Sequence, residues 1–347
     1  MKLIEYSLGG VKPLAESFIS SYLPEDFIPK HKLLLFFNDI IADILIKANE
    51  YDLSSKQIDL EKNKIIPDDI DNPLDWLIEN GHKKVAYDST KAHVFFSILT
   101  DFIHYMHESF SCSERGKITV AYSISRKPIK DNLFYLCWLL VDSEELITNI
   151  LYQKPQDFDV SRIGIEMKED IFRKAGQKIE FPIDTDLLVD VIYNKASPKG
   201  LSSIWDQSLH LITANKRYPT SVGNLNFIFA DEKVWQEHWE TYYDKITYIM
   251  IFMIEVSIDL FEEIYNADEN IKTFNSLIRN IKYDLTFSKE FNSETYIELF
   301  KALSFTCEEC LEKYELKNDV LKEFIYDYLF TCPYCSHVER VGQYYIE

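Results

Sequence analysis

The chain has 347 residues, enough to bury a sizeable core, and its 57 acidic and 37 basic side chains give a formal net charge of −20. This charge makes broad DNA binding unfavourable, because lysine and arginine supply most of the affinity for phosphates. The longest apolar stretch, residues 248–254, is followed at once by Glu255 and is too short to span a bilayer. No secretory signal pattern opens the sequence, so we expect a cytoplasmic protein with no membrane segment.

The N-terminal part contains three helix candidates. Residues 11–23 form a short one, and apolar side chains recur at helical spacing over residues 32–49. Residues 50–72 are polar without a clear period and are interpreted as a loop. Pro73 can occupy the first turn of the third helix, which Gly81 ends.

Residues 88–142 are predicted to form a long helical hairpin around which the other helices are organised. Ser89 and Thr90 can cap its first helix, and Gly116 marks a short basic turn into the second. Pro128 lacks an amide hydrogen and should kink or restart the second helix. An amphipathic hairpin of this length cannot bury its apolar faces alone, so other helices must pack against it.

Seven further helices are expected in the rest of the body. They cover residues 144–152, with Ser143 as cap, then 161–176, 184–193, 201–213, 231–265, 270–283 and 293–303. The helix that begins at Asp231 would be roughly 50 Å long, and its apolar middle should cross the core or a dimer interface. Residues 224–230 form the clearest isolated strand-like stretch, and the alternative is an extended connector.

Four of the six cysteines lie in two Cys-x-x-Cys pairs separated by 21 residues: Cys307 with Cys310, and Cys332 with Cys335. Two such turns can present four thiolates to one tetrahedral zinc ion. Four cysteine ligands leave no open position for water, so we expect a structural Zn²⁺ site with His337 as a neighbour only. Cys112 and Cys137 have no nucleophile context and are interpreted as core thiols.

Over residues 305–346 this pattern resembles the zinc-ribbon family of four-cysteine knuckles. Strand-like residues 324–331 lead into the second turn and residues 338–346 lead out of it. The resemblance implies a small β module that binds protein or nucleic acid and uses zinc in place of a core. The predicted fold is therefore mainly α, with a multi-helical body in residues 1–304 and a zinc-ribbon-like module in residues 305–347.

One face of the first hairpin helix is polar. It carries His93, Ser97, Thr100, Asp101, His104, His107 and Glu108. Histidine can act as acid, base or metal ligand near neutral pH, whereas the alternative is a solvated or interfacial face. A di-metal site would need paired Glu-x-x-His motifs, and Asp101-x-x-His104 has no evident partner.

The turn and the helix after it are basic. Residues 114–130 carry a net charge of +4, from Arg115, Lys117, Arg126, Lys127 and Lys130 against Glu114. Such a segment beside histidines can hold a phosphate, or it is a simple surface patch. A functional face would bring His93, His104 and His107 together with Arg126 or Lys127, because the second helix returns antiparallel to the first.

Residues 90–145 resemble the HEPN family, compact helical proteins that include metal-independent ribonucleases. Their motif is an arginine followed four to six residues later by a histidine, and neither Arg126 nor Arg279 is followed by one. The resemblance implies a helical fold. For an active member it implies a catalytic site that combines His104 or His107 with Arg126 and Lys127.

Two functional hypotheses follow. The first is a cytoplasmic helical interaction or regulatory protein with structural zinc, which binds a protein partner or a second copy. The second is a HEPN-like ribonuclease that cleaves RNA as a stress or phage-defence effector.

Asp206 and His210, one helical turn apart, can also pair, although such a histidine is more often only a half-buried side chain. No complete catalytic motif occurs in the sequence, which favours the first hypothesis.

Overall fold

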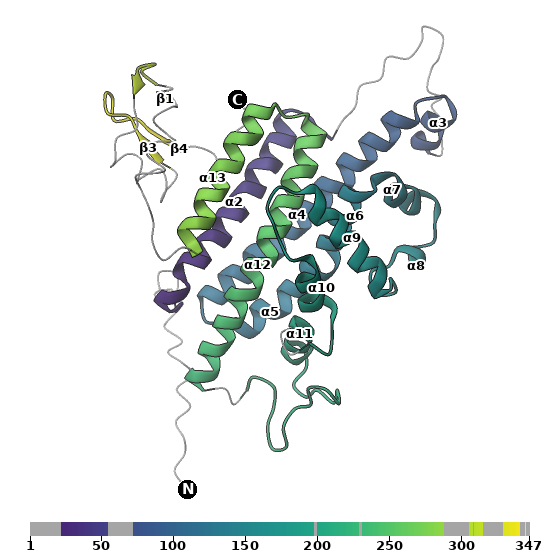
Figure 1. Ribbon diagram of the computed structural model, residues 1–347, viewed down its shortest axis with the longest axis vertical. Helices are drawn as coiled ribbons and strands as arrows, with labels where there is room; N and C mark the ends of the chain where they lie inside the picture. Colours follow the sequence, from purple (N-terminus) through teal and green to yellow (C-terminus); the bar gives the residue numbers. More distant parts are fainter. Residues whose placement is uncertain are drawn as a thin grey trace.

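The computed structural model describes residues 22–54, 72–197, 200–228, 231–287, 305–307, 309–314, 329–340 and 344. Across these residues the protein is mainly α-helical, as the sequence predicts (Figure 1). Five predictions lie wholly or largely outside the described residues: the helix at 11–23, the loop at 50–72, the helix at 293–303 and the strand-like segments at 324–331 and 338–346.

Most of the described helices are separated by short connections in the sequence. In chain order they are the 3-10 turn η1 (Glu25–Phe27), α2 (Ile28–Glu50), α3 (Pro73–Glu79), α4 (Lys83–Glu114), α5 (Ile118–Lys127), the π-helical turn η2 (Pro128–Asn132), α6 (Leu133–Val141), α7 (Ser143–Tyr152), α8 (Pro155–Phe158), α9 (Ile165–Lys178), α10 (Thr185–Tyr193), α11 (Leu201–Leu209), α12 (Glu232–Tyr265) and α13 (Glu269–Phe287). Among the described helices, none is both long and apolar enough to cross a membrane.

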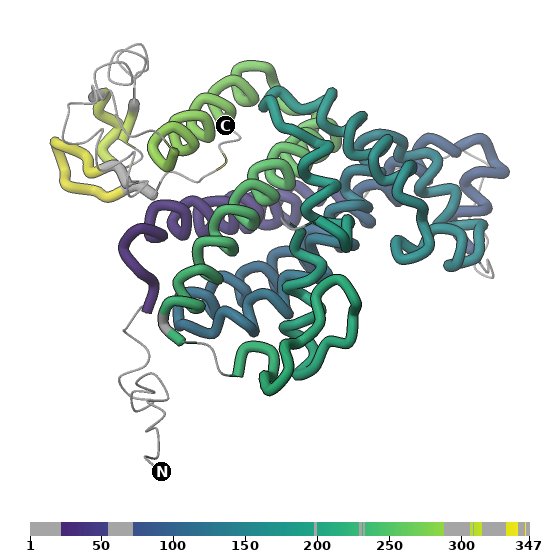
Figure 2. Tube along the Cα trace, turned by 60° about the horizontal axis from the view of Figure 1, so that its bottom comes forward, coloured from purple at the N-terminus to yellow at the C-terminus, as the bar shows by residue number. Residues whose placement is uncertain are grey.

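Helix α12 is the central element of the core. It packs against α2, α4, α5 and α6, and Figure 2 shows it running through the middle of the helical body. Its apolar middle is almost completely buried, from Ile249 to Phe261. The predicted core-crossing helix is therefore confirmed, and its apolar sides are covered by neighbouring helices of the same chain.

The predicted hairpin is present, and its two arms, α4 and α5, pack against each other. Gly116 takes a φ of +73° in the turn, a left-handed conformation that favours glycine. Pro128 opens the π-helical turn η2, after which α6 continues, so the expected kink is a local widening of the helix. Thr90 is no cap, because α4 begins seven residues earlier, and its hydroxyl donates to the carbonyl of Ala86 at 2.8 Å.

Two other helix starts differ from the prediction for a local reason. The cap of α7 is Asp142 rather than Ser143, because the Asp142 carboxylate accepts the N–H of Glu145 at 2.9 Å. Helix α9 does not begin at Ser161, because the Ser161 N–H is bound by the Asp159 carboxylate in a turn. In both cases an aspartate provides the stronger acceptor for a backbone N–H.

The strand interpretation of residues 224–230 is wrong for the described residues 224–228, which form no strand and include a turn at 226–228, so this part of the chain is a connector. Helix α11 ends at Leu209, and the chain then folds into a loop that Asn226 ties together. The Asn226 amide donates to the carbonyl of His210 at 2.7 Å and to the hydroxyl of Thr213 at 2.8 Å. These side-chain bonds replace the strand partner that the alternating pattern would need.

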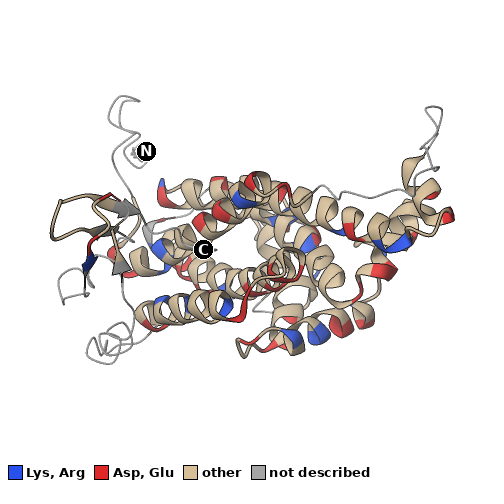
Figure 3. Cartoon of the chain, turned by 90° about the horizontal axis from the view of Figure 1, so that it is seen from above, with Lys and Arg blue, Asp and Glu red and all other residues tan. Residues whose placement is uncertain are grey.

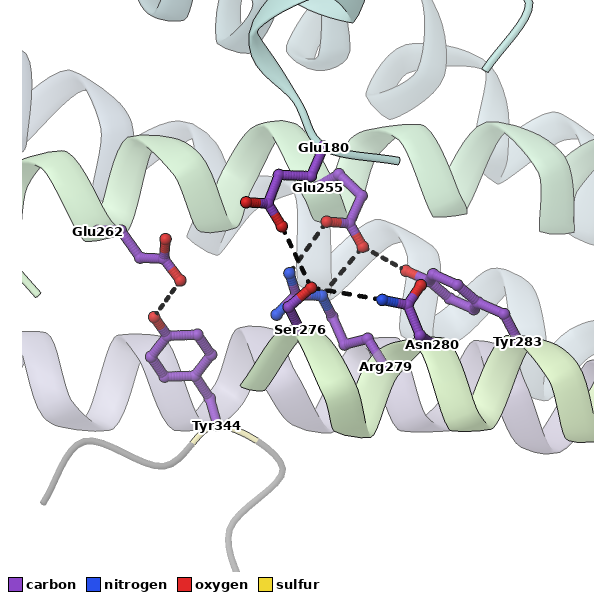
Figure 4. A network of polar contacts seen from close by, with 8 residues as sticks. All are labelled: Glu180, Glu255, Glu262, Ser276, Arg279, Asn280, Tyr283 and Tyr344. Carbon is purple, nitrogen blue, oxygen red and sulfur yellow. Dashed lines mark hydrogen bonds and ion pairs between the residues drawn. The ribbon is translucent and has the colours of Figure 1, made fainter. Parts of the chain in front are cut away.

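A buried ion pair joins α13 to α12. The guanidinium of Arg279 donates two hydrogen bonds of 3.0 Å to the carboxylate of Glu255, and the hydroxyl of Tyr283 donates a third at 2.6 Å (Figure 4). Both charged side chains are only 6% exposed. The charges are thus removed from water together, which requires this close geometry.

Four short strands accompany the cysteines. β1 (Phe305–Thr306) pairs antiparallel with β2 (Lys313–Tyr314), and β3 (Leu329–Thr331) pairs antiparallel with β4 (Val338–Arg340). They lie beside α13 at one edge of the molecule (Figures 1 and 2). Beyond β4, Tyr344 is buried against α12: its ring lies 5.4 Å from that of Phe261, and its hydroxyl donates to Glu262 at 2.7 Å.

Candidate metal centre

Each cysteine pair lies at the turn between two short strands. In the first turn the N–H of Cys307 donates to the carbonyl of Glu312 at 3.1 Å, and the N–H of Leu311 donates back to the carbonyl of Cys307 at 2.9 Å. Leu311 takes a φ of +59°, which closes the turn. The chain therefore folds tightly around Cys307 and brings Cys310 close to it.

The second turn repeats this pattern at the same spacing. The N–H of Cys332 donates to the carbonyl of His337 at 2.8 Å, the N–H of Ser336 donates to the carbonyl of Cys332 at 3.0 Å, and Ser336 also has a φ of +59°. The two Cys-x-x-Cys segments are thus two copies of one local structure. His337 contributes its backbone carbonyl to this turn.

The four sulfur atoms converge. The Sγ atoms of Cys307, Cys310, Cys332 and Cys335 all lie within 4.8 Å of one another. The two contacts between the turns, Cys307 with Cys335 and Cys310 with Cys332, are both 3.7 Å. A tetrahedral ion with metal–sulfur bonds of about 2.3 Å requires sulfur atoms about 3.8 Å apart, so the cluster can hold a metal ion.

The electrostatics of the cluster favour one thiolate among the four sulfur atoms. Burial raises the pKa of the Cys332 thiol, but backbone hydrogen bonds from Cys335 and Tyr334, with hydrogen bonds from the neighbouring thiols, outweigh it and lower that pKa to about 7. Backbone hydrogen bonds lower the pKa values of the other three thiols, but burial and hydrogen bonds among the thiols outweigh them and raise those values. A thiolate, not a thiol, is the metal ligand. Cys307 and Cys332 are buried whereas Cys335 is exposed, so one side of the cluster reaches the surface.

The polar face of α4 is organised by Asp101. Its carboxylate accepts hydrogen bonds from Lys127 and from Asn132, both at 2.7 Å, and the Lys127 ammonium also lies 4.7 Å from the ring centre of Tyr105. Burial raises the pKa of Asp101, but these bonds outweigh it and hold the pKa below its usual value. Asp101 thereby joins α4 to η2 across the hairpin.

Among the described residues, no network of hydrogen bonds or ion pairs joins the four residues predicted to be catalytic. Lys127 is paired with Asp101, and the side chains of His104, His107 and Arg126 are exposed, as is that of His93. Across the parts of the chain that the structure describes, no hydrogen bond or ion pair joins Arg126 to either histidine. Their catalytic role stays a prediction.

Three smaller predictions can be compared with the structure. Asp206 accepts the hydroxyl of Tyr218 at 2.6 Å, and His210 contributes backbone groups to the neighbouring turn. Cys112 and Cys137 are buried, as expected for core thiols, and burial raises the pKa of the Cys137 thiol well above its usual value. The sequence did not reveal the role of Tyr344, since nothing in its local pattern indicates a contact with α12.

Comparisons with protein-family models, with curated proteins and with solved structures found no match. Neither the zinc-ribbon nor the HEPN resemblance therefore gains support from a relative. The geometry of the four cysteines indicates a metal site, and it can bind a metal ion whatever the ancestry of the chain.

Proposed function

We propose that this protein is a helical interaction or regulatory protein whose four-cysteine cluster binds one structural zinc ion. The single observation that carries the metal assignment is the convergence of two equivalent turns, with sulfur–sulfur distances of 3.7 Å between them. Cysteine sulfur is a soft ligand, and four of them in a tetrahedral arrangement are typical of zinc or of an iron–sulfur centre. One ion with no bridging sulfide fits the 3.7 Å spacing best.

A structural role is supported by the shortness of the strands that the structure describes around the cysteines. The strands are two or three residues long, and isolated two-stranded hairpins are marginally stable at best in water. A zinc ion bound by both turns would link the two hairpins and supply the missing stability. We include in this proposal the division of the chain into a body, residues 1–304, and a module, residues 305–347.

The interaction role is supported by the character of the surface. Acidic positions are spread over most helices, in keeping with the net charge of −20 (Figure 3). Such a surface repels nucleic acid at long range and suits a basic or polar protein partner, or contacts between copies through local patches. We propose that the protein acts in the cytoplasm, where free thiols persist and bind metal.

The metal assignment is tested by elemental analysis of freshly purified protein and of two variants. Wild type and Cys112→Ala should each retain one zinc per chain, because Cys112 lies in the helical body away from the cluster. Cys332→Ser should lose the metal and keep most of its helical circular-dichroism signal. Loss of all helical signal would show that the module and the body fold as one unit.

The ribonuclease hypothesis is tested with the same preparation. RNA cleavage in the presence of a chelator, abolished by the double change His104→Ala and Arg126→Ala in a folded protein, would replace the interaction role by an enzymatic one. Recovery of a stable protein partner from the native host, with no RNA cleavage, would support the interaction role. These outcomes are independent of the zinc content.

A further inference from the structure

The chain between the end of α11 and the start of α12 exposes a strip of aliphatic side chains. We call residues 209–228 the connecting loop, and its exposed aliphatic residues are Leu209, Leu211, Ile212, Val222 and Ile228. Leu211 and Ile212 are 62% and 65% exposed, and Val222 is fully exposed. Figure 1 shows the loop at the end of the body at which α12 begins. A contiguous exposed apolar patch on a protein surface commonly marks a place where another molecule binds.

The backbone of the connecting loop is fixed by polar contacts within the loop. The N–H of Thr220 donates to the carbonyl of Thr213 at 2.9 Å, and the hydroxyl of Thr220 donates to the side-chain oxygen of Asn226 at 2.7 Å. The N–H of Asn226 donates to the carbonyl of Leu211 at 2.9 Å. A loop that is already ordered in this way loses little conformational entropy when a partner covers its outward side chains.

Charge also sets the connecting loop apart from the rest of the chain. Residues 207–230 contain no aspartate or glutamate, and they are the longest such stretch in a chain with 57 acidic residues. Two cations in this stretch, Lys216 and Arg217, are exposed. The first turns of α12 follow at once and have the opposite character, since Glu237 and Glu240 are exposed there. The aliphatic strip is therefore flanked by charges of both signs.

The connecting loop packs on the first turns of α12. The ring of Phe227 lies 4.7 Å from the ring of His238, the residue next to Glu237. Phe227 takes a φ of +61°, a conformation that a bulky side chain rarely adopts and that the surrounding contacts must maintain. Glu237 has an ion pair with Lys233, but this pair is 4.0 Å long and exposed to solvent, so it is weak.

We propose that the connecting loop and the first turns of α12 form a two-fold interface between two copies of this chain. In a two-fold dimer the same patch meets itself, so the patch must be self-complementary. The aliphatic strips of the two loops would cover each other. Lys216 and Arg217 of each copy would then face Glu237 and Glu240 of the other copy. This inference rests on the interaction role proposed above and names its partner, a second copy.

A second copy fits this patch better than a basic protein or an anionic membrane does. A basic partner would meet the two cations of the loop, and an anionic membrane would meet the carboxylates of α12. A two-fold contact instead pairs each sign with the other. The general repulsion between two chains of net charge −20 is screened beyond about 8 Å at physiological ionic strength, whereas the paired charges lie closer together.

The test is sedimentation equilibrium of the zinc-loaded protein at physiological ionic strength over a series of protein concentrations. The wild type should form dimers. Leu211→Ser combined with Ile212→Ser should weaken the association at least about tenfold, because both side chains lie in the aliphatic strip. Ile46→Ser is the matched control, since Ile46 is 54% exposed on α2, and this variant should associate as wild type does.

An exchange of charges tests the pairing itself. Lys216→Glu with Arg217→Glu places four carboxylates at each contact, and Glu237→Lys with Glu240→Lys places four cations there, so each double variant alone should associate at least about tenfold more weakly than wild type. An equimolar mixture of the two double variants should form dimers again, because each chain then supplies the charge that the other lacks. Misfolding of either variant would not produce this recovery.

A wild type that remains monomeric throughout the concentration series would overturn the proposal. Binding of that monomer to vesicles that contain phosphatidylserine would then assign the connecting loop to a lipid surface. Dimers that Leu211→Ser with Ile212→Ser leaves intact, or a mixture of the charge variants that does not recover, would also overturn the proposal. A monomer that still binds a stable protein partner from the native host would overturn this inference and leave the interaction role in place.

Discussion

Replacing Glu255 by alanine tests whether the ion pair between α12 and α13 is as tightly constrained as its geometry indicates. The change would leave the Arg279 guanidinium buried without its carboxylate and would also remove the acceptor of the Tyr283 hydroxyl. Nη1 of Arg279 already has no hydrogen-bond partner, so no second acceptor is at hand. Breaking a buried pair in this way costs about 3–5 kcal/mol.

A loss of that size is a large part of the total, because domains unfold with about 5–15 kcal/mol. The assay is urea unfolding monitored by circular dichroism, and the free energies of unfolding of wild type and variant are compared provided that their m-values are equal. The control is Glu269→Ala, which removes the exposed partner of Lys272 at 2.8 Å and should cost at most about 1 kcal/mol.

The double variant Glu255→Leu with Arg279→Met removes both charges and should recover most of the stability that Glu255→Ala loses. This recovery would show that the cost arises from an unpaired charge and not from lost packing. If Glu255→Ala were no more destabilising than Glu269→Ala, the side chains of Glu255 and Arg279 would have to be solvated in solution, and the ion pair would not be buried.

Three further predictions concern single positions. Burial raises the pKa of Asp259 from 3.8 to about 7. The negative charges of Glu262, Glu255 and Glu180 also raise this pKa, and the positive charge of Arg279 lowers it only in part. The folded state thus holds this proton longer, so stability should fall as pH rises from about 4 to 7, and Asp259→Asn should be more stable than wild type at pH 8 by about 1–3 kcal/mol in urea unfolding. Gly116→Ala should cost about 1–2 kcal/mol in the same assay, because alanine must adopt a φ of +73°. Tyr344→Ala should retain its metal but become sensitive to limited proteolysis near the C-terminus, since the contacts with Phe261 and Glu262 are lost; unchanged cleavage would contradict the docking of this segment.

The helices were predictable where one physical signal dominated. The apolar period of α2, the mostly apolar middle of α12 and the left-handed turn at Gly116 are local properties of the sequence. The errors arose where neighbouring residues competed for the same role. Asp142 and Ser143 can both cap a helix, and the alternating residues at 224–228 look like a strand until Asn226 bonds to the loop beside it.

The four-cysteine cluster could be predicted from the sequence, whereas the buried ion pair between α12 and α13 could not. Four cysteines in two equal spacings predict their own convergence, because the chemistry of the ligand set fixes the geometry. The pair of Glu255 and Arg279 gave no such signal, since the two residues are 24 positions apart and each resembles an ordinary surface charge. Only the packing of α13 on α12 brings them together.

The structural zinc site is tested by the zinc content of the protein, measured together with the number of reactive thiols. We expect one zinc ion per chain, with Cys307, Cys310, Cys332 and Cys335 protected from thiol reagents until a chelator removes the metal. Freshly purified protein that contains no zinc, and in which all four thiols react at once, would contradict it.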